Sequence, residues 1–424
     1  MTPRFTGFAT TGLRLVALAV FLGVVSGRTE LFLVAVPIVA VLLSGMRATR
    51  APRYTLTHEV SATRLLEGDR LTVTVALTAE HPLPLVELLE GLPPLTELAA
   101  GHNRTTFRLR AGERRQWTYE LRCPARGRFT PGSVHVRIAD GTGVRVFEAS
   151  HVGPTVVTVY PHAAPLRHVP HPLRTQTSVG NYVAGEVGTG LEPGEIRLFA
   201  PGDPIRWVNW RASLRLGELY VTQYHLERNA DVVLMLDTLS QVGRPPVASL
   251  DMCARAAASL ASAYLARKDR VGLIEYGETF RWVRPAAGRA QFERIMDALV
   301  AAQPAFTYVR KDLALVPPRI LPPRALVIAL SPLLDSRFVD AVGDLMARRF
   351  DVVLLSVSPV EVTRAVLRPS PFGDLACRLW ALERRGQLEA LRRRGLDVLE
   401  WTPAEPLELA LAPLARRRRR VVAA

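Results

Sequence analysis

The chain opens with two apolar runs, Thr11 to Val25 and Leu31 to Leu43, separated by a polar break at residues 27–30. Each run alone is shorter than the ~20 residues that span a bilayer comfortably, although small flanking residues lengthen both. A signal peptide is the alternative interpretation of the first run, since Arg4 and Arg14 give it a positive start. A second apolar run follows it, in place of a cleavage site and polar sequence, so the pattern favours a transmembrane helical hairpin.

The arginines around this hairpin, which is predicted for residues 1–50, set its expected orientation. They cluster near its two outer ends, at Arg4, Arg14, Arg47, Arg50 and Arg53. The turn holds Arg28, and Glu30 offsets that charge. The positive-inside rule places both outer ends in the cytoplasm. We therefore expect a multi-pass protein of the cell membrane, with two helices in the lipid bilayer and soluble domains that face the cytoplasm.

From Tyr54 to Tyr160 apolar and polar residues alternate in short runs, of which Leu71 to Leu77 is the clearest. A period of two is typical of half-buried strands, and turn pairs such as Asp140-Gly141 separate the runs. Other runs of this kind are Thr106–Leu109, Trp117–Leu121, Val134–Ile138, Val144–Phe147 and Val156–Val159. Many short strands at regular spacing predict a β-sandwich-like domain over residues 51–160.

From Ala230 onward, strand and helix patterns alternate. Val232 to Leu236 and Leu326 to Leu330 are continuous apolar runs, as expected of buried parallel strands. Further strands are predicted at 270–276, 280–284, 352–357 and 398–401, and helices at 248–266, 290–302, 338–348 and 375–394. This alternation predicts a doubly wound α/β sheet over residues 230–415. The whole chain is therefore expected to be an α+β multidomain protein.

The charge of the chain is strongly basic, with a formal net charge of +15. A basic balance fits nucleic acid, an anionic membrane surface or an acidic partner, but the sequence contains no zinc-finger spacing and no aromatic-studded RNA-binding strand. We expect no nucleic-acid partner. Residues 416–424 form a basic tail that starts with five arginines, Arg416 to Arg420. The simplest expectation for this tail is a solvated, disordered end, which anionic lipid would also attract.

Three cysteines, Cys123, Cys253 and Cys377, lie far apart in the sequence. Their odd number and spacing argue against a disulfide framework and fit a reducing compartment. This agrees with the cytoplasmic placement of the soluble domains.

The stretch from Gly188 to Arg228, within a connector at residues 161–229, fits no simple periodicity. Asp203 followed by Pro204 is a helix-start signal, because the carboxylate can cap free N–H groups and proline is tolerated at the first helical position. We predict a helix over Pro204 to Ser213 and strands at Ile196 to Phe199 and Leu219 to Leu226.

This stretch resembles the signature of the domain-of-unknown-function 58 (DUF58) family. The matching positions are Arg197, Phe199, Gly202, Asp203, Arg206, Trp210 and Ser213. Glu227 and Arg228 match the polar end of the strand that follows the signature, whereas Leu214 and Arg215 stand where Ala-Arg is usual. The resemblance implies that the α/β part is similar to a von Willebrand factor A-type domain. It also implies a partner, because such proteins are typically encoded beside MoxR-type AAA+ ATPases, often with transglutaminase-like membrane proteins.

The signature residues admit two interpretations. In the first they form an internal latch between the β-sandwich-like domain and the A-type domain. Arg197 and Arg206 would pair with Asp203, Glu195 or Glu227, and the two tryptophans would fill the seam between the domains. In the second they form a surface for a partner, because Trp and Arg dominate binding hot spots. The candidate binding or latch residues are Arg197, Asp203, Arg206, Trp207, Trp210, Ser213 and Glu227.

A-type domains often bind a divalent cation after their first strand, which needs hard oxygen ligands. Here Asp237 is present, but Leu239 and Gln241 replace the two serines of the usual motif. Ser331 stands where a later aspartate is expected, with Asp335 nearby, and Thr307 could serve as the threonine. We expect no tightly bound metal and no cofactor, and a capping role for Asp237.

The prediction from these observations is a membrane-anchored, non-enzymatic adaptor that works with a MoxR-type ATPase in envelope protein assembly or maturation. Two alternatives stay open: an envelope-associated hydrolase that uses Asp237 or the signature carboxylates, and a cation-dependent protein-binding A-type domain. No catalytic residues are assigned, because the sequence shows neither a Gly-x-Ser-x-Gly elbow nor a phosphate loop.

Overall fold

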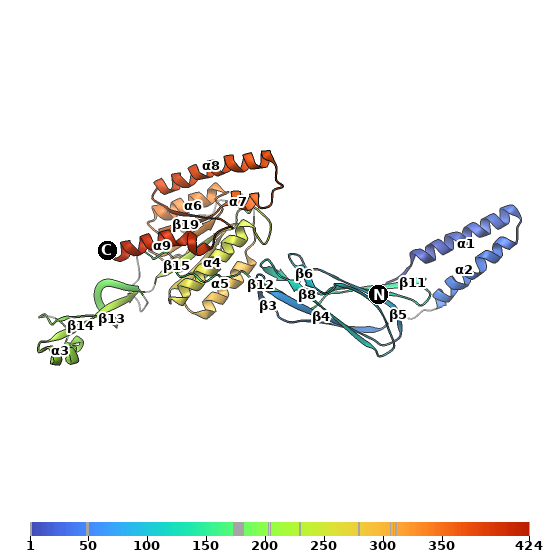
Figure 1. The fold of residues 1–424 in the computed structure, drawn as a ribbon, viewed down its shortest axis with the longest axis horizontal. Helices are drawn as coiled ribbons and strands as arrows, with labels where there is room; N and C mark the ends of the chain where they lie inside the picture. The colour runs from blue at the N-terminus through green and yellow to red at the C-terminus, as the bar shows by residue number, and fades with distance from the viewer. Residues whose placement is uncertain are drawn as a thin grey trace. The chain divides into compact units, whose positions relative to one another are not determined.

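The computed structural model of the chain describes residues 2–47, 51–172, 182–201, 203, 205–228, 230–278, 280–305, 307, 309 and 312–423. The chain divides into two compact units, Met1–Val159 and Tyr160–Ala424. The first contains two helices and three antiparallel sheets, and the second contains a six-stranded sheet with helices and a separate two-stranded ribbon (Figure 1).

Two apolar helices, α1 (Gly7–Ser26) and α2 (Glu30–Arg47), begin the first unit. Among the described residues, α1 is the one helix that is long and apolar enough to cross a membrane; the apolar part of α2, Glu30–Met46, is shorter. The two helices pack against each other at small residues, because a Cβ at Gly12 would lie 3.3 Å from Ile38. Membrane insertion of α2, and the orientation of both helices, stay predictions.

Both ends of this helix pair contact the turn between two strands of the first unit. β1 (Thr2–Phe5) pairs with β11 (Arg145–His151), and the Thr6 hydroxyl donates to the Gly143 carbonyl at 2.6 Å. At the other end, a Cβ on Gly45 would come within 2.5 Å of Val144, so a larger residue would not fit without movement. The sequence did not predict β1, which is too short to show a period.

Three antiparallel sheets make up the rest of the first unit. The strands that complete them are β2 (Tyr54–Val60), β3 (Arg64–Leu66), β4 (Arg70–Ala79), β5 (Leu83–Gly91), β6 (Glu97–Ala100), β7 (Arg104–Leu109), β8 (Arg114–Arg122), β9 (Gly127–Phe129), β10 (Ser133–Ala139) and β12 (Val157–Tyr160). The strand orders are β1-β11-β10-β5-β7, β2-β4-β8-β6 and β3-β12-β9. Alternate residues of facing strands, such as Val73, Leu121 and Val136, share one buried core, as the alternating sequence pattern predicts.

The six-stranded sheet of the second unit has the order β17-β16-β15-β18-β19-β20, in which only the β16–β17 pair is antiparallel. Its strands are β15 (Asp231–Asp237), β16 (Arg270–Tyr276), β17 (Arg281–Ala286), β18 (Leu326–Ser331), β19 (Asp351–Val357) and β20 (Asp397–Trp401). Each strand predicted from Ala230 onward is present to within about two residues. The continuous apolar runs are explained by burial on both faces of the central strands.

Helices cover both faces of this sheet (Figure 1). One core joins Val232 and Leu234 of β15 to α4 (Ser249–Ala266), α5 (Arg289–Ala301) and α9 (Leu407–Ala423). The core on the other face joins Val233 and Met235 to η2 (Leu313–Leu315), α6 (Ser336–Ala347) and α8 (Pro371–Arg393). A short helix, α7 (Pro359–Arg364), follows β19 and was not predicted. The unit is thus a doubly wound α/β sheet.

The prediction of a disordered end at Arg416–Arg420 is wrong, because these residues continue α9. Leu407, Leu411 and Leu414 of α9 are buried in the core, and Arg418 follows Leu414 on the same side of the helix. The Arg418 guanidinium is buried and binds Asp351 of β19 at 2.8 Å and Asp397 of β20 at 2.7 Å. Two carboxylates at the start of neighbouring strands therefore hold the basic segment against the domain.

Candidate functional site

The DUF58-like stretch forms an antiparallel ribbon that we call the arm, residues 182–228. It consists of β13 (Tyr182–Leu198), the 3₁₀ turn η1 (Ile205–Trp207), α3 (Trp210–Leu216) and β14 (Tyr220–Arg228). The two predicted strands are present, but one continuous helix over Pro204–Ser213 is wrong. Val208 pairs with Val221 of β14, which interrupts helical hydrogen bonding, and Asn209 caps α3 through a 3.1 Å bond from the Ala212 amide.

Asp203 does not cap a helix and instead closes a loop with Arg197. The Arg197 guanidinium donates two hydrogen bonds to the Asp203 carboxylate, at 2.7 and 2.6 Å, and the Ala200 amide donates a third at 2.8 Å. The hydrogen bonds from Arg197 and then from Ala200 hold the pKa of Asp203 below its ordinary value. This bidentate pair shapes the turn between β13 and η1.

Ser213 joins α3 to β14 within the arm. Its hydroxyl donates to the Asn209 carbonyl at 2.8 Å and accepts from the Tyr220 amide at 2.9 Å. The Asn209 amide group also donates to Thr222 at 3.1 Å, so both side chains fix the helix on the strand. Asn209 was not predicted from the sequence, although asparagine is among the residues preferred at a helix N-cap.

Large apolar side chains of the arm face solvent. Trp210 is 60% exposed and Leu214, one helical turn later on the same side of α3, is 86% exposed. Exposed apolar residues elsewhere on the arm are Ile196, Leu198, Ile205, Leu216 and Leu219. Trp207 is half-buried, and the side chains of Arg206 and Glu227 lie outside the described structure. Of the seven predicted residues, the structure therefore brings Arg197 and Asp203 together, uses Ser213 for internal support and leaves Trp210 on the surface.

A second polar cluster lies at the carboxyl edge of the six-stranded sheet. β16 and β17, which follow β15 in sequence, lie on one side of β15 in the sheet, and β18 lies on the other side. The direction of strand order therefore reverses between β15 and β18. Ligands of doubly wound sheets bind at such a point. There the Ser331 hydroxyl donates to the Asp237 carboxylate at 2.5 Å, and the Leu239 amide donates to it at 3.0 Å. The capping role expected of Asp237 is therefore present.

Two arginines bring positive charge to this edge. Arg337 donates to Asp335 at 2.9 and 2.5 Å and also to the Thr307 carbonyl. Arg384 of α8 is buried and donates to the Pro332 carbonyl at 2.9 Å, to Glu400 at 3.0 Å and to the Ser356 hydroxyl. Neither arginine was singled out from the sequence; Arg384 lies far along the chain from the Pro332 carbonyl that it binds.

Burial raises the pKa of Asp237 to about 7, and the hydrogen bonds from Ser331 and Leu239 and the charge of Arg337 oppose this rise. Each oxygen of the Asp237 carboxyl accepts one hydrogen bond from the protein. Within the described ranges, no three His, Cys, Asp or Glu residues come close enough to hold a metal ion. The arrangement supplies structural hydrogen bonds and a titratable carboxyl.

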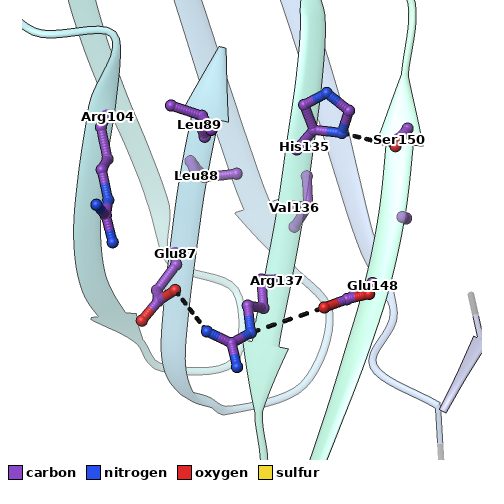
Figure 2. Close-up of a pocket in the computed structure, with 10 residues that line it drawn as sticks. Glu87, Leu88, Leu89, Arg104, His135, Val136, Arg137, Glu148 and Ser150 are labelled. Atoms are coloured by element: carbon purple, nitrogen blue, oxygen red, sulfur yellow. Dashed lines mark hydrogen bonds and ion pairs between the residues drawn. The ribbon is translucent and has the colours of Figure 1, made fainter. Parts of the chain in front are cut away.

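A shallow hollow of about 410 Å³ lies on the outer face of the five-stranded sheet (Figure 2). Arg137 of β10 lies between Glu87 of β5 and Glu148 of β11, at 3.2 and 3.8 Å. His135 contacts the Ser150 hydroxyl at 2.8 Å. A serine beside a histidine is one element of nucleophilic catalysis, which also needs a group that orients the histidine. Among the described residues none is hydrogen-bonded to the other ring nitrogen of His135, so these are cross-strand pairs that stabilise a sheet.

Taken together, these features define a protein with an α/β domain that bears an arm with solvent-facing apolar side chains. The carboxyl edge of its sheet carries both aspartates and arginines. Residues 195–362 match the family described as "Protein of unknown function DUF58". The match starts in the arm, includes Asp237, Ser331 and Arg337, and ends in α7. It leaves out the first unit and the helices α8 and α9.

Two similar proteins are described as uncharacterized. The chain is 25% identical over 287 residues to uncharacterized protein YeaD of Bacillus subtilis, a match that covers 64% of this chain and 70% of that protein. It is 28% identical over 138 residues to uncharacterized protein Rv1480 of Mycobacterium tuberculosis, covering 32% of this chain and 44% of that protein. These relatives assign no activity.

Solved structures give only a remote likeness. The cupredoxin domain of amoB from Nitrosocaldus yellowstonii aligns with 25% of this chain and 86% of its own, at 15% identity and a TM-score of 0.18. The sporulation control protein Spo0M of Bacillus subtilis aligns with 26% of this chain and 50% of its own, at 14% identity and a TM-score of 0.15. Such TM-scores are too low to indicate a shared fold.

Proposed function

We propose that this protein is a membrane-anchored, non-enzymatic adaptor whose arm docks a partner protein. The observation that carries the proposal is the solvent-facing apolar surface of the arm, formed around Trp210 and Leu214 of α3. Exposed apolar clusters on a folded domain typically mark interaction sites. Aromatic anchors of this kind dominate binding energies.

The internal contacts of the arm support a binding role. Arg197 is paired with Asp203, and Ser213 and Asn209 hold α3 on β14, so the polar groups maintain the shape of the arm. The apolar side chains are left to contact a partner, and the preformed helix lowers the entropy lost on binding. In this proposal Arg197, Asp203 and Ser213 maintain the shape of the arm, and Trp210 is the signature residue that contacts the partner.

The partner that we propose is a MoxR-type AAA+ ATPase, as the DUF58 resemblance implies, with a transglutaminase-like membrane protein as a further member of the assembly. The α/β unit, similar to a von Willebrand factor A-type domain, would present its arm to the ATPase during envelope protein assembly or maturation. Anchoring by α1 and α2, with the soluble units in the cytoplasm, would place it beside a cytoplasmic ATPase. The apolar composition of α1 supports the anchor.

The expected result of removing the two apolar anchors is a loss of ATPase binding. The double variant Trp210→Ala with Leu214→Ala should weaken binding of the purified full chain to a purified MoxR-type ATPase at least about thirtyfold, since loss of the Trp210 anchor alone is worth about 2 kcal/mol. Biolayer interferometry in detergent measures this. Both side chains are exposed, so the fold should not change.

The matched control is Leu315→Ala, which removes a 79% exposed leucine from η2, elsewhere in the same unit. It should leave affinity unchanged. No binding by the unmodified chain, or equal losses in the double variant and the control, would refute the docking role of the arm.

A further inference from the structure

Helix α8 has two apolar faces. The first is buried against the α/β domain and includes Cys377, Leu388 and Leu391, with Arg384 between them. The second points away from the domain and is exposed: Phe372 85%, Leu375 55%, Leu379 59% and Leu382 61%. A helix on the surface of a domain needs one apolar face for its own packing, so the second face is available to a partner.

The exposed residues follow one another at intervals of three, four and three positions. This is the spacing of the a and d positions of a heptad repeat, which form the seam of a coiled coil. The buried residues Cys377, Arg384 and Leu391 then occupy f positions, on the side of the helix opposite the seam. A second helix could therefore pack on α8 without displacing its own domain.

The charges beside this seam differ between its two edges. Arg378 and Arg385 occupy g positions on one edge, and Glu383 occupies an e position on the other. Within the described part of the chain, neither Arg378 nor Glu383 forms an ion pair or hydrogen bond. In a parallel pair of identical helices a g residue lies beside the e residue five positions later on the partner, which brings Arg378 to Glu383 twice. In an antiparallel pair g residues lie beside g residues, which brings arginines together.

We propose that α8 is a homodimerisation helix, which pairs in parallel with α8 of a second copy of this chain through Phe372, Leu375, Leu379 and Leu382. The two-fold symmetry of such a pair makes the contact closed and self-complementary. The seam ends at Gly386, where the next a position carries no side chain, so the contact is short. A short contact of this kind forms more readily when the copies of the chain are already held at a high local concentration. This surface is separate from the arm and does not depend on the proposed ATPase.

A lipid surface is the competing occupant of an amphipathic helix. Interfacial helices carry Lys and Arg along both borders of their apolar face, whereas here Arg378 and Arg385 border only one edge of the seam, Glu383 lies on the other edge and Glu389 follows it. The four apolar residues also form a narrow line. Both features favour a second helix, rather than a lipid bilayer, as the partner of the exposed face of α8.

The test is cysteine cross-linking of the full chain in isolated membranes of expressing cells. The three native cysteines are buried, so an introduced thiol reports its own position. Leu382→Cys places a thiol at a d position, where two copies meet across the two-fold axis, and mild oxidation should give a disulfide-linked dimer. The control Gln387→Cys lies on the same helix, exposed and off the seam, and should give at least about fivefold less dimer.

Charge exchange tests the orientation. In the Leu382→Cys background, Arg378→Glu or Glu383→Arg alone should each lower the dimer yield, and the two together should restore it. Equal dimer yields at positions 382 and 387, or single charge changes without effect, would overturn the proposal. A third outcome would also overturn the proposal: the thiol at position 382 forms no dimer and does not react with a water-soluble maleimide because lipid covers it. In that case α8 would lie on the bilayer.

Discussion

Arg418→Ala should lower the free energy of unfolding of the α/β unit by about 3–5 kcal/mol, because it removes the buried cation that two largely buried carboxylates share. Arg418 is 3% exposed and binds both oxygens of Asp351, at 2.9 and 2.8 Å, and Asp397 at 2.7 Å. Burial alone lowers the pKa of Arg418, but the hydrogen bonds that it donates to the two aspartates more than offset this and raise the pKa. Hydrogen exchange of the β19 and β20 amides, measured by mass spectrometry, reports the change in this unit specifically.

Arg417→Ala is the matched control for this experiment. Arg417 has a side chain 73% exposed and lies 3.4 Å from Asp397, so its removal should cost less than about 1 kcal/mol. A similar loss in both variants would mean that the charge of the segment, and not the buried pair, stabilises the domain. No loss in Arg418→Ala would mean that α9 is not fixed to the strands in solution.

Asp237→Asn should stabilise the α/β unit at pH 8 and leave its stability nearly unchanged at pH 4. The folded protein holds a proton on Asp237 up to about pH 7, whereas the ordinary pKa is 3.8. The folded state therefore binds more protons than the unfolded state between these values, and stability falls as pH rises through this window, by about 1.4 kcal/mol per pH unit. Asparagine is always neutral, and its oxygen can accept from the Leu239 amide while its NH2 group donates to the Ser331 hydroxyl oxygen. The variant should therefore lack this slope.

The neighbouring carboxylate provides a comparison of opposite sign. The hydrogen bonds from Arg337 lower the pKa of Asp335, so its contribution is present above the ordinary pKa and is lost as pH falls. Asp335→Asn should therefore destabilise the unit at pH 8 and have a smaller effect in acid. Denaturation monitored at several pH values by circular dichroism measures both variants. A wild-type pH profile that Asp237→Asn leaves unchanged would show that Asp237 is not the titrating group.

The order of helices and strands in the second unit could be read directly from the sequence. Strands buried on both faces must be apolar throughout, so β15, β18 and β19 appear as continuous runs. Helices between them carry apolar residues at helical spacing. The short helix α7 had no such signal, because six residues are too few to establish a period.

Where local signals and tertiary contacts disagreed, the tertiary contacts prevailed. Asp203-Pro204 is a sound helix start, yet Val208 pairs with Val221, and Asp203 binds Arg197 instead. The run of arginines suggested a solvated tail, yet the preceding leucines of α9 carry Arg418 to Asp351 and Asp397. The decisive contacts are Val208 with Val221 in the first case and Arg418 with its two aspartates in the second. Each contact joins separate segments of the chain, so a pattern of neighbouring residues does not reveal it.

The sequence by itself determined the apolar character of the N-terminal helix, the alternation of strands and helices, the DUF58-like stretch and the place of Asp237 at the end of a strand. These follow from periodicity and short motifs, which depend on neighbouring residues. Only the tertiary structure decided that Ser331 and Leu239 engage Asp237 and that Trp210 and the outer face of α8 are exposed. Exposure and pairing depend on which distant segments cover a side chain, and the fold alone sets that.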